Sequence, residues 1–219
     1  MDRCGLNNYR MSSYEGENMK IIKDDQEETL TSKTVLVSRD NNVIRFFDEV
    51  SDASVCEAIK HIDYIEGIKK YTGITIILNS PGGDIYNGLA LYDRIRNCKK
   101  VVTIVGTGFV ASMAFIIYLA GDKRICTKNA RFLNHQARME ISGRVADIKI
   151  EQAEITLMED LCVDIIAERT LLTIKKLKHD TKVGDVYISS QEAVQMGICH
   201  EIISEVIKET VNENTKNPN

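Results

Sequence analysis

Two short runs of largely apolar residues, ITIIL at 74–78 and KVVTIVG at 100–106, constrain the fold of this chain most strongly. Runs of this length and composition are typical of strands that are buried on both faces of a sheet. A glycine-containing turn follows each run, and a segment with apolar residues at helical spacing comes next. A chain that alternates strand and helix in this way forms crossover connections between parallel strands. We therefore expect an α/β fold with a mainly parallel sheet covered by helices.

The same patterns predict the other elements of this fold. Apolar spacing predicts helices at 54–65, 84–97 and 111–121, and short apolar runs predict strands at 34–38, 42–47, 123–128 and 130–135. Toward the C-terminus, residues 175–189 predict a short helix, a loop and a strand. Ser189 and Glu192 then stand at capping-box spacing before a helix that ends at Gly197.

One predicted helix is much longer than the rest. No glycine or proline occurs from Arg144 to Thr170, and apolar residues recur there at helical spacing, among them Ile155 and Met158. A compact domain of this size does not need a helix of that length. The pattern therefore predicts a projecting arm that meets another subunit, with two helices and an unmarked break as the alternative.

Length and composition limit the class of protein. The chain has 219 residues, of which 43% are hydrophobic and 27% charged, as expected for one globular domain. We expect a flexible N-terminal arm at 1–32, the folded domain at 33–207 and a disordered tail at 208–219. The net charge of −4, without a basic block, disfavours nucleic acid and acidic membranes as partners.

The cysteines and the apolar runs bear on location. The six cysteines are scattered, with no C-x-x-C pair and no histidine at ligand spacing, so we expect reduced thiols and no metal site. The N-terminus lacks the apolar core of a signal peptide, and no run reaches membrane-spanning length. These features favour a cytoplasmic protein.

A glycine motif offers one alternative function. GTGFVA at 106–111 matches the dinucleotide-binding pattern G-x-G-x-x-A and lies between a predicted strand and a predicted helix. The strand after that helix should end in an acidic residue for the ribose hydroxyls, but it ends in Lys128 and Asn129. Dinucleotide binding is therefore the weaker interpretation.

A second set of residues fits hydrolysis by a serine nucleophile, which needs a base and donors for an oxyanion. Ser112 lies at a strand-to-helix transition, His135 at the end of an apolar strand, and Asp185 before the apolar run VYI. Gly83, in the turn NSPGG, permits close backbone approach to a ligand. Each residue alone also has a structural explanation, such as a polar helix start for Ser112 or a turn for Asp185.

The order of these residues along the chain limits the kind of hydrolase. Ser112, His135 and Asp185 follow an order unlike that of α/β-hydrolases or of the chymotrypsin and subtilisin types. Ser112 also lacks the G-x-S-x-G motif. A serine hydrolase with this order belongs to another fold. Asp180, among charged residues five positions before Asp185, is the alternative acid, whereas Gly184 beside Asp185 would let the backbone turn tightly toward the site.

Segments across most of the chain resemble, in order and spacing, the proteolytic subunit of the Clp protease. They are NSPGGDIYNGLALYDRIR, GFVASMAF, RFLNHQA, SGRVADIKIEQAEI and GDVYISSQEAVQMGI, and the similarity runs from about residue 35 to residue 205. The resemblance implies a crotonase-like fold, built from stacked ββα units with a mainly parallel sheet and a long projecting handle helix.

The resemblance also implies roles for single residues. Ser112 would be the nucleophile, His135 the general base and Asp185 the residue that orients it. Gly83 and Met113 would supply the backbone amides of the oxyanion hole. Two seven-membered rings would stack through the handle helices around an inner chamber. Unfolded proteins or peptides would be the substrates, fed by a hexameric AAA+ unfoldase that uses the ATP, so no cofactor is expected in this chain.

Some positions depart from the usual pattern of the family that the chain resembles. Ala114 follows the A-S-M segment where glycine is usual, Ala137 follows H-Q where many members have proline, and the loop before Asp185 is one residue longer. Two alternatives therefore stand beside the leading hypothesis of an unfoldase-fed peptidase. One is a stand-alone relative such as a phage-type maturation protease. The other is a catalytically silent structural subunit or an acyl-CoA-binding crotonase relative.

Overall fold

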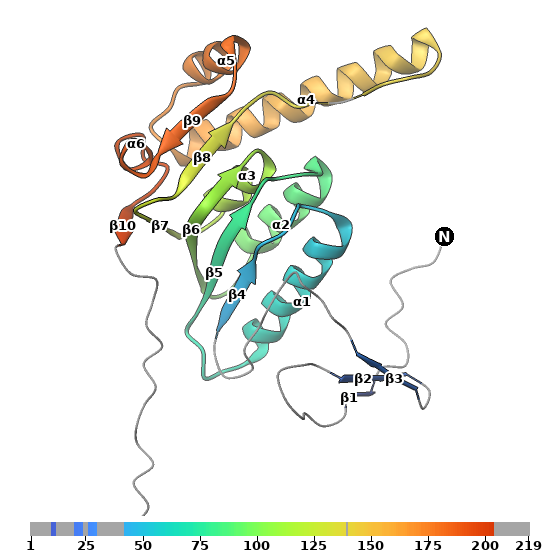
Figure 1. Cartoon of the computed structure of the whole chain (residues 1–219), viewed down its shortest axis with the longest axis vertical. Helices are drawn as coiled ribbons and strands as arrows, with labels where there is room; N and C mark the ends of the chain where they lie inside the picture. Colours follow the sequence, from blue (N-terminus) through green and yellow to red (C-terminus); the bar gives the residue numbers. More distant parts are fainter. Residues whose placement is uncertain (1–9, 12–19, 24–25, 30–41, 139, 204–219) are drawn as a thin grey trace, which may run out of the picture.

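The computed structural model describes residues 10–11, 20–23, 26–29, 42–138 and 140–203, and most of them form one sheet with helices packed against it (Figure 1). The strands of this sheet are β4 (Val43–Phe46), β5 (Gly73–Ser80), β6 (Val101–Ala111), β7 (Lys123–Thr127), β8 (Arg131–Asn134), β9 (Val186–Ser189) and β10 (Glu201–Ile203). The helices are α1 (Asp52–Gly67), α2 (Ile85–Arg96), α3 (Met113–Leu119), α4 (Val145–Arg169), α5 (Ile174–Val183) and α6 (Ser190–Gln195).

The sheet is mainly parallel. Its main path runs β10, β7, β6, β5 and β4, and every neighbouring pair on this path is parallel. β8 pairs in parallel with the end of β6, whereas β9 is antiparallel to β8. Parallel neighbours need long crossover connections, and α1, α2 and α3 lie in those connections. The predicted α/β fold is confirmed.

The central strand β5 is apolar on both of its faces. Ile74, Ile76 and Leu78 are buried in the main core, together with apolar residues of α1, α2 and α3 and of the C-terminal end of α4. On the opposite face, Ile77 packs with Val105 and Ile125, which lie at the same register in the next two strands. The run at 74–78 thus marks a strand covered on both sides, as its composition predicts.

β6 extends beyond the predicted strand and changes its partner along its length. Residues 103–106 pair with β7, whereas residues 109–111 pair with β8. Between these segments Gly108 has a φ of 54°, and the side-chain oxygen of Asn79 accepts the amide of Phe109 at 2.9 Å. The GTGFVA motif is therefore part of a strand and not the phosphate-binding turn that the dinucleotide interpretation requires.

α4 is one continuous helix of 25 residues, so the alternative of two helices is wrong. Its C-terminal end packs into the core through Ile165 and Ile166, and the rest projects beyond the sheet (Figure 1). Apolar side chains along the projecting part are exposed, including Val145, Ile150 and Leu157. The predicted projecting helix is confirmed.

Three short strands near the N-terminus have no counterpart in the sequence prediction. β1 (Arg10–Met11), β2 (Lys20–Lys23) and β3 (Gln26–Thr29) form an antiparallel sheet of their own within the predicted arm. The predicted strand at 34–38 and the predicted tail at 208–219 lie outside the described residues. The division into arm, domain and tail stays a prediction. Within the described ranges, no helix has the length and apolar character needed to span a membrane.

Candidate active site

Ser112 joins β6 to α3 in an unusual backbone conformation. Its φ is 54° and its ψ is −127°, and among the described residues it is the one non-glycine residue with a positive φ. Such angles cost about 1–3 kcal/mol and persist only where the surrounding structure imposes them. Here the Ser112 amide donates to the Leu133 carbonyl in β8 at 2.9 Å, and the flanking Ala111 and Met113 are buried.

The hydroxyl of Ser112 does not cap the helix that it precedes. A serine at a helix start normally accepts a hydrogen bond from an amide of the first turn, but the Ser112 side chain makes no such bond. Instead, Ser112 lines a cavity of about 310 Å³. Ser112 therefore lies at the start of a helix, as the structural explanation expects, but its hydroxyl does not serve as a cap.

The glycine turn NSPGG lies directly against this serine. A methyl group placed on Gly82 would come within 2.6 Å of both the Ser112 Cβ atom and the Ala111 carbonyl oxygen. Gly82 also has a φ of 92°, which residues with a side chain rarely adopt. Glycine at this position thus allows two loops from neighbouring strands to meet at Ser112.

The backbone amides of Gly83 and Met113, beside Ser112, have no hydrogen-bond partner within their own secondary structure. Val50 donates its amide to the Gly82 carbonyl and accepts the amide of Asp84, both at 2.8 Å. In this parallel bridge the amide of Gly83 itself points away from Val50. Met113 is the first residue of α3, where an amide has no partner within the helix. Amides in this state are the donors that an oxyanion hole uses.

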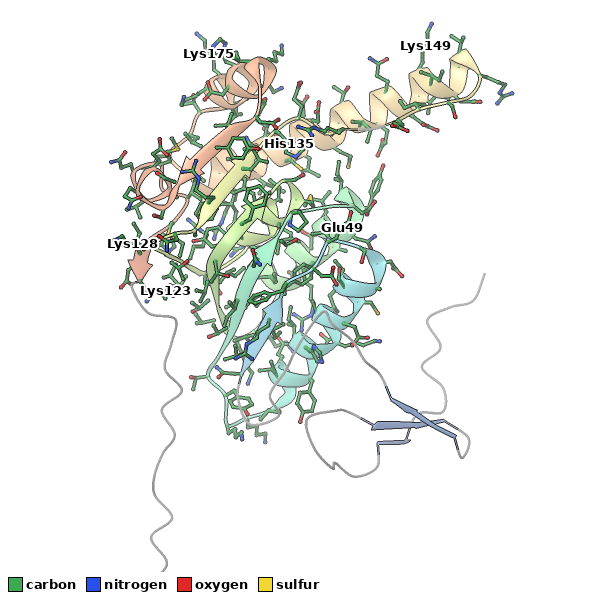
Figure 2. The ribbon with its side chains drawn as sticks, viewed as in Figure 1. Glu49, Lys123, Lys128, His135, Lys149 and Lys175 are labelled. Atoms are coloured by element: carbon green, nitrogen blue, oxygen red, sulfur yellow. The ribbon has the colours of Figure 1, made fainter. Side chains whose placement is uncertain are left out.

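His135 follows β8 and lies close to α4 (Figure 2). It lines the same cavity as Ser112, beside Met113 and Ile116 of α3. Its Nδ1 atom is buried and has no hydrogen-bond partner among the described residues. A histidine that acts as a general base in a triad needs an acceptor at this nitrogen, so the site is incomplete at that atom.

Asp185 precedes β9 and lies opposite the end of β8. The antiparallel register ends with the pair of Asn134 and Val186, and His135 and Asp185 are the next residues beyond that pair on the two strands. The Asp185 carboxylate nevertheless forms an ion pair with Arg138, whose Nη2 lies 2.8 Å from Oδ2 and 3.0 Å from Oδ1. The structure thus brings the predicted nucleophile and base to one cavity, while the predicted acid is engaged by an arginine.

The alternative acid lies elsewhere. Asp180 is within α5, where it pairs with Lys176 at 2.7 Å, and neither it nor Asp185 is among the residues that line the cavity containing Ser112. Gly184, next to the predicted acid, has an extended backbone, and a methyl group placed on it would have open space within 4 Å. The expectation that this glycine permits a tight turn is therefore wrong, because any residue can adopt its conformation.

Helices α4 and α5 form the other wall of the cavity. The charged side chains of that wall are Glu159, Asp160, Lys178 and Lys182. A carboxylate oxygen of Glu159 accepts the Ala137 amide at 2.8 Å, which fixes the segment after His135 to α4. Sequence reasoning missed Glu159 and Arg138. The available signal was Ala137 itself, because the proline usual at that position has no amide hydrogen to donate.

Other nucleophile or metal chemistry has little support in this cavity. Burial raises the pKa of the Cys162 thiol, which lines the same wall, to about 11. The thiol therefore stays protonated and weakly nucleophilic near neutral pH. Within the described residues, no group of three or more His, Cys, Asp or Glu side chains is arranged to hold a metal ion.

Comparison with known sequences decides the family. The sequence profile of the Clp protease family matches residues 25–206, which is most of the chain. This chain belongs to the Clp protease family. The family predicted from the sequence is thereby confirmed, as are the fold class and the class of enzyme, a Clp-type serine peptidase.

Individual relatives align with about three fifths of this Clp protease family member. "ATP-dependent Clp protease proteolytic subunit 3" of Rhizobium etli is 36% identical over 133 residues, covering 60% of this chain and 68% of the relative. The corresponding subunit of Deinococcus radiodurans is 33% identical, covering 60% of this chain and 65% of its own length. Subunit 2 of Pseudomonas aeruginosa is 39% identical, with 59% and 65% covered. The alignments thus leave about a third of each relative unmatched.

Proposed function

We propose that this chain is a serine endopeptidase that cleaves unfolded polypeptides to short peptides, with Ser112 as its nucleophile. The observation that carries the proposal is the conformation of Ser112. Its positive φ is imposed by buried neighbours, its hydroxyl is not used as a helix cap, and it shares a cavity with His135. A strained residue with an unused hydroxyl next to an imidazole is the arrangement that nucleophilic catalysis requires.

In the first step, His135 would take the hydroxyl proton of Ser112 as the oxygen attacks the carbonyl carbon of the scissile peptide bond. The carbonyl oxygen becomes negatively charged, and the amides of Gly83 and Met113 would stabilise it. The protonated imidazole of His135 would then give its proton to the leaving amine, and an acyl-enzyme would remain on Ser112. Water, deprotonated by His135, would release the second product by the reverse sequence.

Asp185 would orient His135 and stabilise its protonated form. This role needs the carboxylate to accept a hydrogen bond from Nδ1 of His135, the buried atom that has no partner among the described residues. The register of β8 and β9 supports Asp185 for this role, since Asp185 and His135 are the residues next to its last pair, Asn134 and Val186.

The decisive test is covalent labelling of Ser112 by a fluorophosphonate, with the modified peptide identified by mass spectrometry. We expect labelling at Ser112, and we expect Ser112→Ala to lose labelling and peptide cleavage, because a triad nucleophile contributes several orders of magnitude in rate. Ser142→Ala, at an exposed serine before α4, is the control and should keep both activities. Peptidase activity that survives in Ser112→Ala would exclude this serine as the nucleophile.

The proposal extends to assembly and partners. The exposed apolar residues of α4 favour a contact with another subunit, because an isolated projecting helix gains nothing from such side chains in water. The relatives are named as ATP-dependent proteolytic subunits. We therefore propose stacked heptameric rings that enclose the active sites, an AAA+ unfoldase that feeds them, and a cytoplasmic location. The particle mass in solution tests the rings, since a monomer would contradict a chamber.

Two other functions give different results in the same assays. A stand-alone maturation protease would label at Ser112 and cleave peptides, but an added AAA+ unfoldase would not accelerate the degradation of folded proteins. A silent structural subunit or an acyl-CoA-binding relative would not label at all. The hydroxyl of Ser112 does not cap α3, which favours an active enzyme over both silent alternatives.

A further inference from the structure

The ion pair between Arg138 and Asp185 competes with the role that the proposed function gives to Asp185. A single guanidinium nitrogen of Arg138 contacts both carboxylate oxygens, at 2.8 Å and 3.0 Å. Arg138 lies three residues after His135, in the segment that leaves β8. The two candidate partners of this carboxylate, an arginine and a histidine, therefore come from the same short stretch of chain.

The histidine is left without a partner at the atom where the carboxylate would bind. Nδ1 of His135 is buried and makes no hydrogen bond to any described residue, which is costly for a polar atom removed from water. His135 and Asp185 each lie one residue beyond the last pair of the β8–β9 register, Asn134 and Val186. One explanation accounts for both the unpartnered Nδ1 of His135 and the ion pair of Asp185. The Asp185 carboxylate is turned toward Arg138 and away from His135.

We propose that Arg138 is a positioning residue that holds the carboxylate of Asp185 away from His135, so that the conformation with this ion pair is a resting state of the active site. This inference rests on the proposed peptidase function. The active state forms when the carboxylate leaves Arg138 and accepts the Nδ1 hydrogen of His135. No covalent step is involved, only an exchange of hydrogen-bond partners between two states.

The exposure of the pair indicates how strongly Arg138 biases this equilibrium. The side chains of Arg138 and Asp185 are 73% and 35% exposed, so water competes for both groups. Ion pairs with this exposure shift an equilibrium by about twofold to fivefold. Arg138 therefore reduces the population of the active state without abolishing it, and a contact made on substrate binding or assembly is sufficient to release the carboxylate.

The test measures the rate at which a fluorophosphonate labels Ser112 in the full chain, as a function of pH. The variants are Arg138→Gln, Asp185→Asn and the double variant, each checked for an unchanged particle mass by sedimentation. We expect Arg138→Gln to label about twofold to fivefold faster than the unmodified protein. Asp185→Asn should label much more slowly, and the double variant should label at the rate of Asp185→Asn, because the gain requires the freed carboxylate.

The pH dependence distinguishes positioning from a merely structural effect. A carboxylate at Nδ1 favours protonated His135, so the midpoint of the labelling profile should move to higher pH in Arg138→Gln. In the double variant relative to Asp185→Asn the midpoint should move less, because only the exposed charge of Arg138 is lost and Glu159, Asp160, Lys178 and Lys182, the other charged groups of the cavity, are the same in both.

A matched control comes from a second arginine–aspartate pair. Arg144 contacts Asp147 at 2.8 Å and 2.9 Å, in a similarly exposed position at the start of α4. Arg144→Gln should not change the labelling rate. An equal gain in that variant, a gain that persists without the Asp185 carboxylate, or no gain in Arg138→Gln would each overturn the role of Arg138. Absence of labelling in every protein, the unmodified one included, would instead overturn the proposed function.

Discussion

Ser112 and Asp185, at two ends of the same candidate site, are held in place by different means. Ser112 lies between a buried strand and a buried helix, and the glycine turn NSPGG packs against its Cβ atom. Asp185 lies in an exposed segment between α5 and β9, next to a glycine with open space around it. Its carboxylate is held by one exposed ion pair.

This difference shows which parts of the site are rigid and which are adjustable. Close packing fixes a residue because any displacement creates a clash or a cavity, whereas an exposed ion pair exchanges with water and with other partners. The proposed nucleophile and oxyanion amides are therefore preorganised in this fold. The proposed acid, Asp185, is the residue that the fold leaves free to occupy more than one position.

The largest expected effect concerns the choice of acid. Asp185→Asn should lower the rate of peptide cleavage by about 10⁴-fold, the loss seen when the orienting carboxylate of a serine protease triad is removed. Asp180→Asn should stay close to the unmodified protein, because that carboxylate pairs with Lys176 within α5. Steady-state cleavage of a fluorogenic peptide measures both. The opposite ranking would assign the third role to Asp180.

A smaller effect, on stability, compares a buried residue of β8 with an exposed residue of β9. Phe132 in β8 is fully buried, with its ring 5.0 Å from that of Tyr118 and 6.2 Å from that of Phe115. Phe132→Ala should reduce the free energy of unfolding by about 3–5 kcal/mol, because it leaves a cavity in the core. Tyr187 in β9 is 56% exposed, and Tyr187→Ala should cost less than about 1 kcal/mol.

Denaturant unfolding, followed by circular dichroism, measures this pair of variants. Equal losses in the two would mean that β9 is as firmly packed as β8. Asp185, which directly precedes β9, would then be held as rigidly as Ser112, and rigidity would not distinguish the two residues.

The smallest expected effects come from the two glycines that flank the ends of the site. Gly82→Ala should cost about 1–3 kcal/mol of stability, since alanine disfavours a φ of 92° and its methyl would lie 2.6 Å from the Ala111 oxygen. It should also slow fluorophosphonate labelling of Ser112. Gly184→Ala should change stability by less than about 0.5 kcal/mol and leave labelling unchanged, because its position is extended and open. Thermal unfolding measures the stability of both variants. Similar losses of stability in Gly82→Ala and Gly184→Ala would contradict the contrast between these two positions.

The fold could be predicted largely because its strands carry a strong pattern. The apolar run at 74–78 and the spacing in residues 84–97 each identify their element without reference to the rest of the chain. The length of β6 could not be predicted, because the glycines of GTGFVA are also typical of a turn. They instead mark the point where the strand changes partners, which depends on contacts with Asn79 and β8 that are distant in sequence.

The candidate site was predictable to a different degree at each residue. Ser112 and His135 lie next to regular apolar elements, so the sheet determines where they meet. The partner of Asp185 was not predictable, because Arg138 is a long, flexible side chain in an irregular segment. No periodic pattern records which of two nearby groups such an arginine or carboxylate contacts. The sequence therefore proposed Asp185 as the acid but could not predict its contact with Arg138.

The antiparallel register of β8 and β9 has a consequence for insertions and deletions. Asp185 is placed by counting from the pair of Asn134 and Val186, and not by the length of the loop that follows α5. A residue added to that loop lengthens the chain but leaves the carboxylate where it was, so related chains can differ there and keep the same acid. A residue added within 186–189 would turn the alternate side chains of β9 to opposite faces and exchange Ile188 for a polar neighbour in the core. Lineages of this fold should therefore accumulate length changes before Asp185 and almost none after it.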